Sequence, residues 1–217
     1  MPATDWSQPT ANPPNTGGRR PDPSKPVGGR PVRTLAVMTY VLGGWQSDFS
    51  DNWARRGADI ADVFAETVNQ GLAATKLEPS DVECGHVGNF VAELFAAQGL
   101  LGGFFGLVHP DFDGMPTARH EAACASGSVA ILAASAEIEA GRYDLACVVG
   151  IEQMRNVPGQ RAAQNLGTAA WTGHEFEDAE FLWPRAFSDL ADEYETRYGL
   201  EYEHLMAMLL VIGAVGY

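Results

Sequence analysis

The chain has 217 residues, of which 46% are hydrophobic and 19% charged, so it can bury one substantial core and part of a second. Its formal net charge of −14, with 14 Lys and Arg against 28 Asp and Glu, argues against a nucleic-acid backbone as a partner. No apolar run reaches the roughly 18 residues needed to span a bilayer, so no membrane span is expected.

The three cysteines, Cys84, Cys124 and Cys147, are far apart in the sequence and show no metal-type pairing. An odd number of cysteines fits a reducing compartment better than a secreted disulfide scaffold. No apolar segment of the signal-peptide kind follows a basic start. We therefore expect a cytoplasmic protein without a metal site.

The first 31 residues hold eight of the thirteen prolines and almost no large apolar side chains. Such a segment cannot bury enough apolar surface to offset the entropy lost on ordering. Residues 1–31 are therefore expected to form a disordered extension.

Strand and helix patterns alternate over the next part of the chain. Residues 33–40 are a short apolar run containing Val and Thr, which predicts the first buried strand. Residues 57–75 predict a helix, because apolar side chains recur every three or four positions, at Ile60, Ala61, Phe64, Val68 and Leu72. Residues 82–90 predict a second strand, and residues 91–101 a short apolar helix closed by two glycines.

The alternation continues with small residues. Residues 116–122 predict an extended segment, and residues 125–140 a helix in which Ala, Ser and Gly dominate. A helix with so little polar surface is usually buried on several sides. Residues 143–151 predict an apolar strand covered on both faces. This order favours an α/β fold with layered helices on a mixed, largely parallel sheet.

The composition changes beyond Met154. Acidic residues interleaved with aromatic ones follow, and residues 187–198 have helical spacing. The last stretch, residues 205–217, is nearly all apolar, and a helix that is hydrophobic all round has nothing of its own to pack against at a chain end.

The strongest chemical feature is the segment His120-Glu-Ala-Ala-Cys124-Ala-Ser-Gly127-Ser128, where a strand ends and the small-residue helix begins. A thiol at a helix start lies near unpaired amides and the positive end of the helix dipole, which lower its pKa below the ordinary value. The small residues that follow leave room for a thioester, and the Cys124 amide could donate to a developing oxyanion. The alternative is a small buried hydrophobic cysteine, which composition alone favours because no base is identifiable.

Two motifs together favour the first alternative. Residues 121–128, Glu-Ala-Ala-Cys-Ala-Ser-Gly-Ser, resemble the nucleophile motif of the thiolase family. Their sequence is similar to that of the family's sterol-carrier-protein-associated group. The resemblance runs from about residue 33 to residue 206. The family's next signature is matched at the expected distance by Gly141, Asp144, Gly150, Glu152 and Met154.

The resemblance implies the amino-terminal half of a thiolase-like α/β fold. It assigns residues 32–154 to the amino-terminal domain and residues 155–217 to a partial loop domain with a truncated or aberrant end. It also implies an acyl-CoA C-acyltransferase in which Cys124 takes the acyl group before a CoA thiol or an acetyl-CoA carbanion attacks it. Covalent catalysis of this kind divides one difficult exchange into two easier ones. The substrate would be a coenzyme A thioester, with no permanently bound cofactor.

Several groups that the resemblance calls for do not occur in this sequence. The family's second half supplies a Gly-His-Pro histidine, an Asn-Glu-Ala segment and a Cys-x-Gly cysteine, and none is present. His109-Pro110 precedes the nucleophile in a turn-like segment, which favours a structural role. His86 is expected to be buried on its strand, and His120 either contacts the site or lies over 10 Å from the sulfur.

The ligand contacts and partners follow from the same comparison of motifs. Arg155 and Arg161 could meet a phosphate, but solvated surface charge is the favoured interpretation, so no CoA-binding residue is assigned. We expect the chain to be incomplete alone, and to form a homo-oligomer or join a second chain that supplies the carboxy-terminal half. The alternatives are a non-catalytic interaction fragment and a thiolase-fold aldolase or lyase subunit acting on acyl-CoA.

Overall fold

The computed structural model describes residues 38–215, with side chains described as far as residue 211. The extension expected over residues 1–31 therefore lies outside the described residues, as do residues 33–37 of the first expected strand. The strands in the described part are β1 (Cys84–Gly88), β2 (Thr117–His120) and β3 (Ala146–Gly150). The α-helices are α1 (Ile60–Thr75), α2 (Ala92–Ala96), α3 (Phe105–Val108), α4 (Ser126–Glu139), α5 (Gly159–Gly167), α6 (Leu182–Tyr198) and α7 (Tyr202–Val215).

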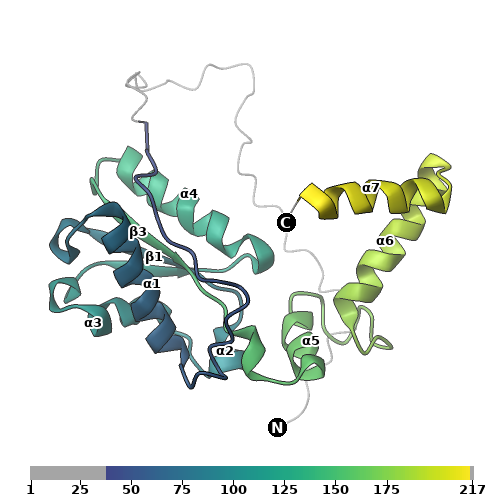
Figure 1. The fold of residues 1–217 in the computed structure, drawn as a ribbon, viewed down its shortest axis with the longest axis horizontal. Helices are drawn as coiled ribbons and strands as arrows, with labels where there is room; N and C mark the ends of the chain where they lie inside the picture. Colours follow the sequence, from purple (N-terminus) through teal and green to yellow (C-terminus); the bar gives the residue numbers. More distant parts are fainter. Residues whose placement is uncertain (1–37, 216–217) are drawn as a thin grey trace, which may run out of the picture. The chain divides into compact units, whose positions relative to one another are not determined.

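The three strands form a parallel sheet in the order β2-β1-β3. The central strand, β1, is buried along its whole length. The last residue of β1, Gly88, lies opposite His120 of β2 and Gly150 of β3, so the carboxyl ends of the strands meet at one edge. Helix α4 covers one face of the sheet and α1 the other (Figure 1). The prediction of an α/β fold with a parallel sheet is confirmed.

Helix α1 confirms the prediction over residues 57–75 but begins three residues later. The Asp59 side chain accepts hydrogen bonds from the amides of Ala61 and Asp62, and the Asp62 side chain accepts one from the Asp59 amide. This reciprocal capping satisfies amides that have no partner within the helix, so it fixes the start at Ile60. The buried stripe holds Val63 where Ala61 was expected, and consists of Ile60, Val63, Phe64, Val68 and Leu72.

Two sequence-based elements differ from the structure. Residues 38–40 belong to no strand, and the Tyr40 side chain is 71% exposed, because an apolar run becomes a strand only where a neighbouring edge pairs with its backbone. The helix expected over residues 91–101 ends at Ala96, since Ala97 adopts the left-handed conformation with φ 52°. A 3-10 helix over Leu101–Phe104 and the short α3 follow.

The small-residue helix α4 is buried on one face only within the described part of the chain. Ser126, Ala130 and Ala134 recur every four positions and lie against the sheet. Ile131 and Leu132 point outward and are 52% and 68% exposed, so the prediction of burial on several sides is not met here. The prediction for α4 is therefore right in its helical state, and its burial in the described chain is confined to the face that lies against the sheet.

The predicted helices after Met154 are present. Helix α6 begins at Leu182, five residues before the predicted start, and includes Pro184 in its first turn, where a missing amide proton costs no hydrogen bond. Helix α7 carries four successive exposed apolar side chains, Met208, Leu209, Leu210 and Val211. Across residues 38–215, no helix combines the length and apolar character needed to cross a membrane.

Candidate functional site

A cavity of about 630 Å³ lies at the carboxyl ends of β1 and β3. Its walls come from the residues that follow the two strands, from the start of α4, and from a loop over residues 47–54. In open α/β sheets, ligands bind in the crevice beyond the carboxyl ends of the strands. The position of this cavity therefore marks it as the candidate site.

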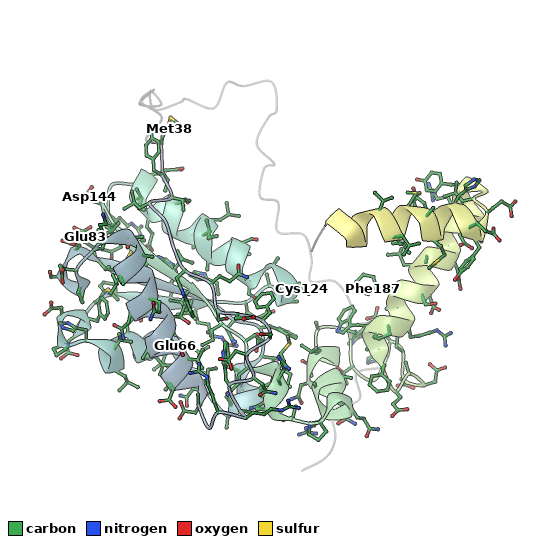
Figure 2. All side chains as sticks on the ribbon, in the orientation of Figure 1. Met38, Glu66, Glu83, Cys124, Asp144 and Phe187 are labelled. Carbon is green, nitrogen blue, oxygen red and sulfur yellow. The ribbon has the colours of Figure 1, made fainter. Side chains whose placement is uncertain are left out.

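Cys124 lies at the wall of this cavity, in a 3-10 helix over Ala123–Ala125 that leads directly into α4 (Figure 2). It is exposed, whereas Cys84 is buried and Cys147 is half-buried. Burial raises the pKa of both Cys84 and Cys147 to about 11. Cys124 is thus the one exposed cysteine of the three, and it lies at the wall of a ligand-sized space.

The turn that presents Cys124 has a strained backbone. Ala123 adopts the left-handed conformation with φ 48°, which costs a residue with a Cβ atom roughly 1–3 kcal/mol. The Glu121 carboxylate accepts a hydrogen bond from the Ala123 amide at 2.6 Å. The Ser126 hydroxyl accepts one from the Ala122 amide at 3.0 Å and donates to the Ala123 carbonyl at 2.7 Å. These side chains hold the strained turn between β2 and α4.

Two glycines let the start of α4 touch the end of β1. A Cβ atom on Gly88 would lie 2.6 Å from the Gly127 Cα and 2.8 Å from the Ser126 carbonyl carbon. Both are main-chain atoms, so nothing flexible could move aside to admit it. The helix therefore rests directly on the backbone of the central strand, three residues after Cys124.

The loops after β1 and β3 are joined by side-chain hydrogen bonds under the cavity. The Asn89 side chain donates to the Ile151 carbonyl at 2.7 Å and accepts from the Ala92 amide at 3.1 Å. The Glu152 carboxylate accepts from the Phe90 amide at 2.8 Å. Burial raises the pKa of Glu152 above its ordinary value, against the opposing effect of its backbone hydrogen bonds. Glu152 of the second signature thus shapes the floor of the cavity.

Asp144, another residue of that signature, lies at the opposite edge of the sheet from the cavity. Its amide donates to the Glu83 carboxylate at 2.6 Å, which joins the residues preceding β3 and β1 (Figure 2). Asp144 therefore has a structural contact at the amino ends of the strands.

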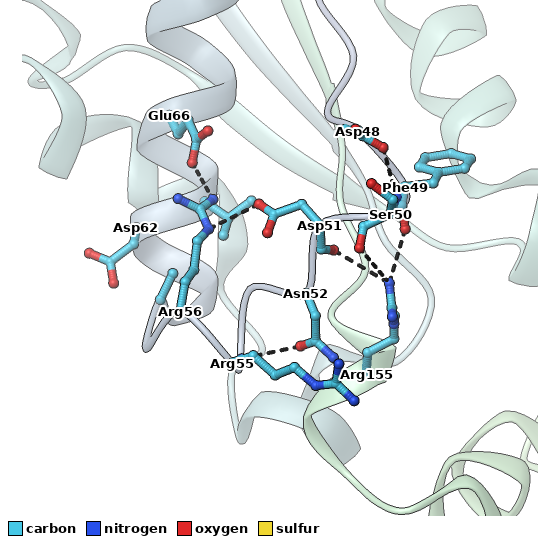
Figure 3. Close-up of polar contacts among 12 residues, drawn as sticks. Asp48, Phe49, Ser50, Asp51, Asn52, Arg55, Arg56, Asp62, Glu66 and Arg155 are labelled. Atoms are coloured by element: carbon cyan, nitrogen blue, oxygen red, sulfur yellow. Dashed lines mark hydrogen bonds and ion pairs between the residues drawn. The ribbon is translucent and has the colours of Figure 1, made fainter.

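Arg155 holds the loop that closes one side of the cavity (Figure 3). Its Nη1 atom donates to the Phe49 carbonyl at 3.0 Å and lies 3.5 Å from the carbonyls of Ser50 and Asp51. The same loop is tied to α1 by Arg56, which pairs with Asp51 and with Glu66. Nη1 of Arg155 thus binds the loop, while Arg161 lies outside the cavity lining and donates to Gln164.

None of the five histidines, all of which lie in the described part, lines the cavity. His86 is buried as expected, and its Nδ1 atom lies 2.9 Å from Nε2 of His120. Burial lowers the pKa of His120, and the nearby His86 lowers it further. His109 accepts a hydrogen bond from the Asp111 amide at the start of a 3-10 helix over Pro110–Phe112. The structure therefore places no histidine base beside Cys124.

Three residues that position the site were not predicted from the sequence. They are Asn89, Ser126 and Arg155, and Arg155 anchors the loop. Asn89 follows a buried strand directly, a position where a polar side chain needs a partner, so its burial could have been suspected. The hydroxyl of Ser126 and the contacts of Arg155 reach segments that only the folded chain brings together.

An exposed cysteine on a strained strand-to-helix turn, beside a cavity at the carboxyl ends of parallel strands, defines an α/β domain that presents a free thiol to a ligand-sized space. Residues 40–207 match the family profile described as "Thiolase, N-terminal domain". The chain belongs to the thiolase family.

Two curated relatives cover most of this chain. An acetyl-CoA acetyltransferase of Methanocaldococcus jannaschii is 28% identical over 178 residues, which are 80% of this chain and 42% of the relative. An acetyl-CoA acetyltransferase of Methanothermobacter thermautotrophicus is 28% identical over 173 residues, which are 79% of this chain and 43% of the relative. The chain thus spans less than half the length of these relatives.

Proposed function

We propose that this chain supplies the nucleophile of a thiolase-type acyl-CoA C-acyltransferase, with Cys124 as the acyl acceptor. The observation that carries the proposal is the exposure of Cys124 at the wall of the cavity, on the turn between β2 and α4. The names of the two relatives support acetyl-CoA chemistry, and a coenzyme A thioester is the substrate class that we propose.

In the proposed reaction, the Cys124 thiolate attacks the carbonyl carbon of the acyl-CoA. The carbon–sulfur bond to CoA then breaks, the CoA thiolate leaves, and the acyl group remains as a thioester on Cys124. Cys124 is the second residue of its 3-10 helix, so its amide has no acceptor within that helix. That amide is the group we assign to the developing oxyanion.

We further propose that a second polypeptide region completes the site. The cavity has no histidine in its lining, and the reaction needs a group that moves protons at neutral pH. The exposed side chains of Ile131 and Leu132 on α4 support a covering partner, supplied either by another copy of the chain or by a separate chain. All three cysteines are free, in keeping with the reducing cytoplasm that remains our prediction for the location.

The acyltransferase is favoured over the two alternatives by the same cysteine. An aldolase or lyase reaction needs no acyl-enzyme, so it gives no reason to expose a thiol in the cavity. A non-catalytic interaction fragment needs neither the cavity nor the strained turn at Ala123.

The test separates acylation from turnover. The 217-residue chain is incubated with acetyl-CoA, and the mass of each cysteine-containing peptide is measured, with Cys124→Ala and Cys147→Ser as matched variants. We expect the acetyl group on Cys124 in the parent chain and in Cys147→Ser, and no acetylation of Cys124→Ala. Cleavage of acetoacetyl-CoA with added CoA should be negligible for the chain alone, because none of its five histidines lines the cavity beside Cys124.

Two results would contradict the proposal. Acetylation spread equally over the three cysteines would show that Cys124 has no special reactivity toward thioesters. If the chain binds acetyl-CoA but no cysteine becomes acetylated, and Cys124→Ala binds acetyl-CoA equally well, the non-catalytic fragment would be favoured.

A further inference from the structure

A second cluster of reactive side chains lies between β1 and α4. Cys84 and His86 alternate along β1, so their side chains share the face of Gly88, which rests on α4. Glu137 belongs to the last turn of α4 and reaches the same space. None of these three residues lines the cavity beside Cys124, so the cluster is a separate feature of the domain.

The distances within this cluster fit one four-coordinate metal ion. One ligand atom from each of Cys84, His86 and Glu137 lies within 4.8 Å of the other two. The sulfur of Cys84 is 3.8 Å from Nε2 of His86, and that nitrogen is 3.4 Å from Oε2 of Glu137. Tetrahedral Zn²⁺ with Zn–S near 2.3 Å and Zn–N or Zn–O near 2.1 Å sets these separations at roughly 3.6 Å and roughly 3.4 Å.

Neighbouring groups orient two of the three side chains. Nδ1 of His86 lies 2.9 Å from Nε2 of His120 on β2, and the rings stack with centroids 5.1 Å apart. Imidazole ligands of metals almost always donate their second N–H to an acceptor, which fixes the tautomer, and Nε2 of His120 is placed to be that acceptor here. The other oxygen of Glu137 lies 3.9 Å from Arg142. Nε2 of His86 is therefore held between the sulfur of Cys84 and Oε2 of Glu137, within reach of both.

The cluster also has the charge that a cation would balance. The Cys84 thiol is buried beside the Glu137 carboxylate, so a cation bound between them would meet a negative charge with little screening by water. A divalent cation would replace the proton, bring the thiolate and the carboxylate together, and leave the neutral imidazole as the third ligand.

We propose that Cys84, His86 and Glu137 bind one Zn²⁺ ion, with water in the fourth position. The Glu137 side chain is 31% exposed, so solvent reaches that side of the cluster. Thiolate, imidazole and carboxylate together suit Zn²⁺ among the common divalent ions. The ion would fasten the last turn of α4 to the first residue of β1, opposite the end at which Gly88 meets Gly127. The site could not be predicted from the sequence, because Glu137 lies far along the chain from Cys84 and His86.

The test uses the metals alone on the full chain. The chain is stripped with a chelator, dialysed to equilibrium against Zn²⁺ or Co²⁺, and analysed for bound metal. We expect one equivalent per chain and, with Co²⁺, the near-ultraviolet absorption of a thiolate-to-metal charge transfer. Cys84→Ser should lose that absorption, and Glu137→Gln should weaken binding roughly tenfold or more.

Matched variants show which residues bind the metal. Cys147→Ser removes a cysteine from the neighbouring strand whose side chain packs on the opposite face, in the core, and it should bind Co²⁺ unchanged, as should Cys124→Ser. His120→Gln should keep the charge-transfer absorption while losing 10–100-fold in affinity. Circular dichroism establishes that each variant is folded, and the partly exposed Glu137 provides a variant that leaves the core intact.

Three outcomes would overturn the proposal. The first is a charge-transfer absorption that survives Cys84→Ser but disappears in Cys147→Ser or Cys124→Ser. The second is the absence of stoichiometric binding of either ion to the folded parent chain. The third is an affinity unchanged by Glu137→Gln, which would reduce the contact of Glu137 with His86 to an ordinary ion pair.

Discussion

Replacing Gly88 by alanine should disturb the joint between β1 and α4 more than any other addition of one methyl group near the site. The new Cβ atom would lie 2.6 Å from the Gly127 Cα and 2.7 Å from its nitrogen, well inside van der Waals contact. Because both atoms belong to the main chain, α4 must move away from the strand. Overpacking of this kind costs about 1–3 kcal/mol of stability.

Gly150→Ala is the matched control for this substitution. Gly150 lies directly opposite Gly88 in the register of β1 and β3, yet a Cβ atom there meets no atom within 4 Å. Urea unfolding followed by tryptophan fluorescence should show the midpoint of Gly88→Ala lowered by roughly 0.5–1 M, and that of Gly150→Ala little changed. Equal midpoints for the two variants, or a normal rate of Cys124 alkylation in Gly88→Ala, would refute the argument that this contact sets the position of the nucleophile.

Three further predictions concern the cysteines and the turn. Iodoacetamide at pH 8 should label Cys124 first, because a thiol with a pKa near 11 is only about one part in a thousand thiolate at that pH; peptide mapping that found Cys84 or Cys147 labelled first would contradict this. The free energy of unfolding should be steady below about pH 9 and fall toward pH 11, since the unfolded chain then releases thiol protons that folded Cys84 and Cys147 retain. Urea midpoints across this pH range measure the fall, which should be smaller in Cys147→Ser. Ser126→Ala removes two hydrogen bonds from the turn at Ala123 and should lower stability by about 1–3 kcal/mol; an unchanged urea midpoint would show that Glu121 alone suffices to hold the turn.

The sequence predicted the elements whose evidence is local. The spacing of Phe64, Val68 and Leu72 indicates a helix regardless of what the helix packs on, and α1 follows it. The predicted start of α1 was three residues too early because the reciprocal hydrogen bonds of Asp59 and Asp62 decide where the helix begins. Many acidic residues in the sequence could have formed such a cap, so the sequence does not single out these two. Residues 38–40 failed as a strand because strand formation depends on a pairing edge that lies elsewhere in the sequence.

The family of the chain could be predicted from the residues around Cys124, whereas the surroundings of Cys124 in the fold could not. The residues around Cys124 resemble the thiolase family, and the family match over residues 40–207 confirms this resemblance. The left-handed conformation of Ala123 has no local signal, because the residues that prefer it are Gly and Asn rather than Ala. The link from Glu152 to the Phe90 amide joins positions 62 residues apart, which no spacing rule along one strand or helix can reveal.

The contact between Gly88 and Gly127 also bears on how this domain can change over evolution. Because the contact is made by main-chain atoms, it limits the size of the residue at position 88 and does not depend on which side chains lie elsewhere. The outward-facing positions of α4, such as Ile131 and Leu132, take no part in this contact, so a change of side chain there leaves the distance from β1 to the start of α4 the same. A pair of residues with no side chain therefore sets how closely the segment that carries Cys124 approaches the central strand of this chain.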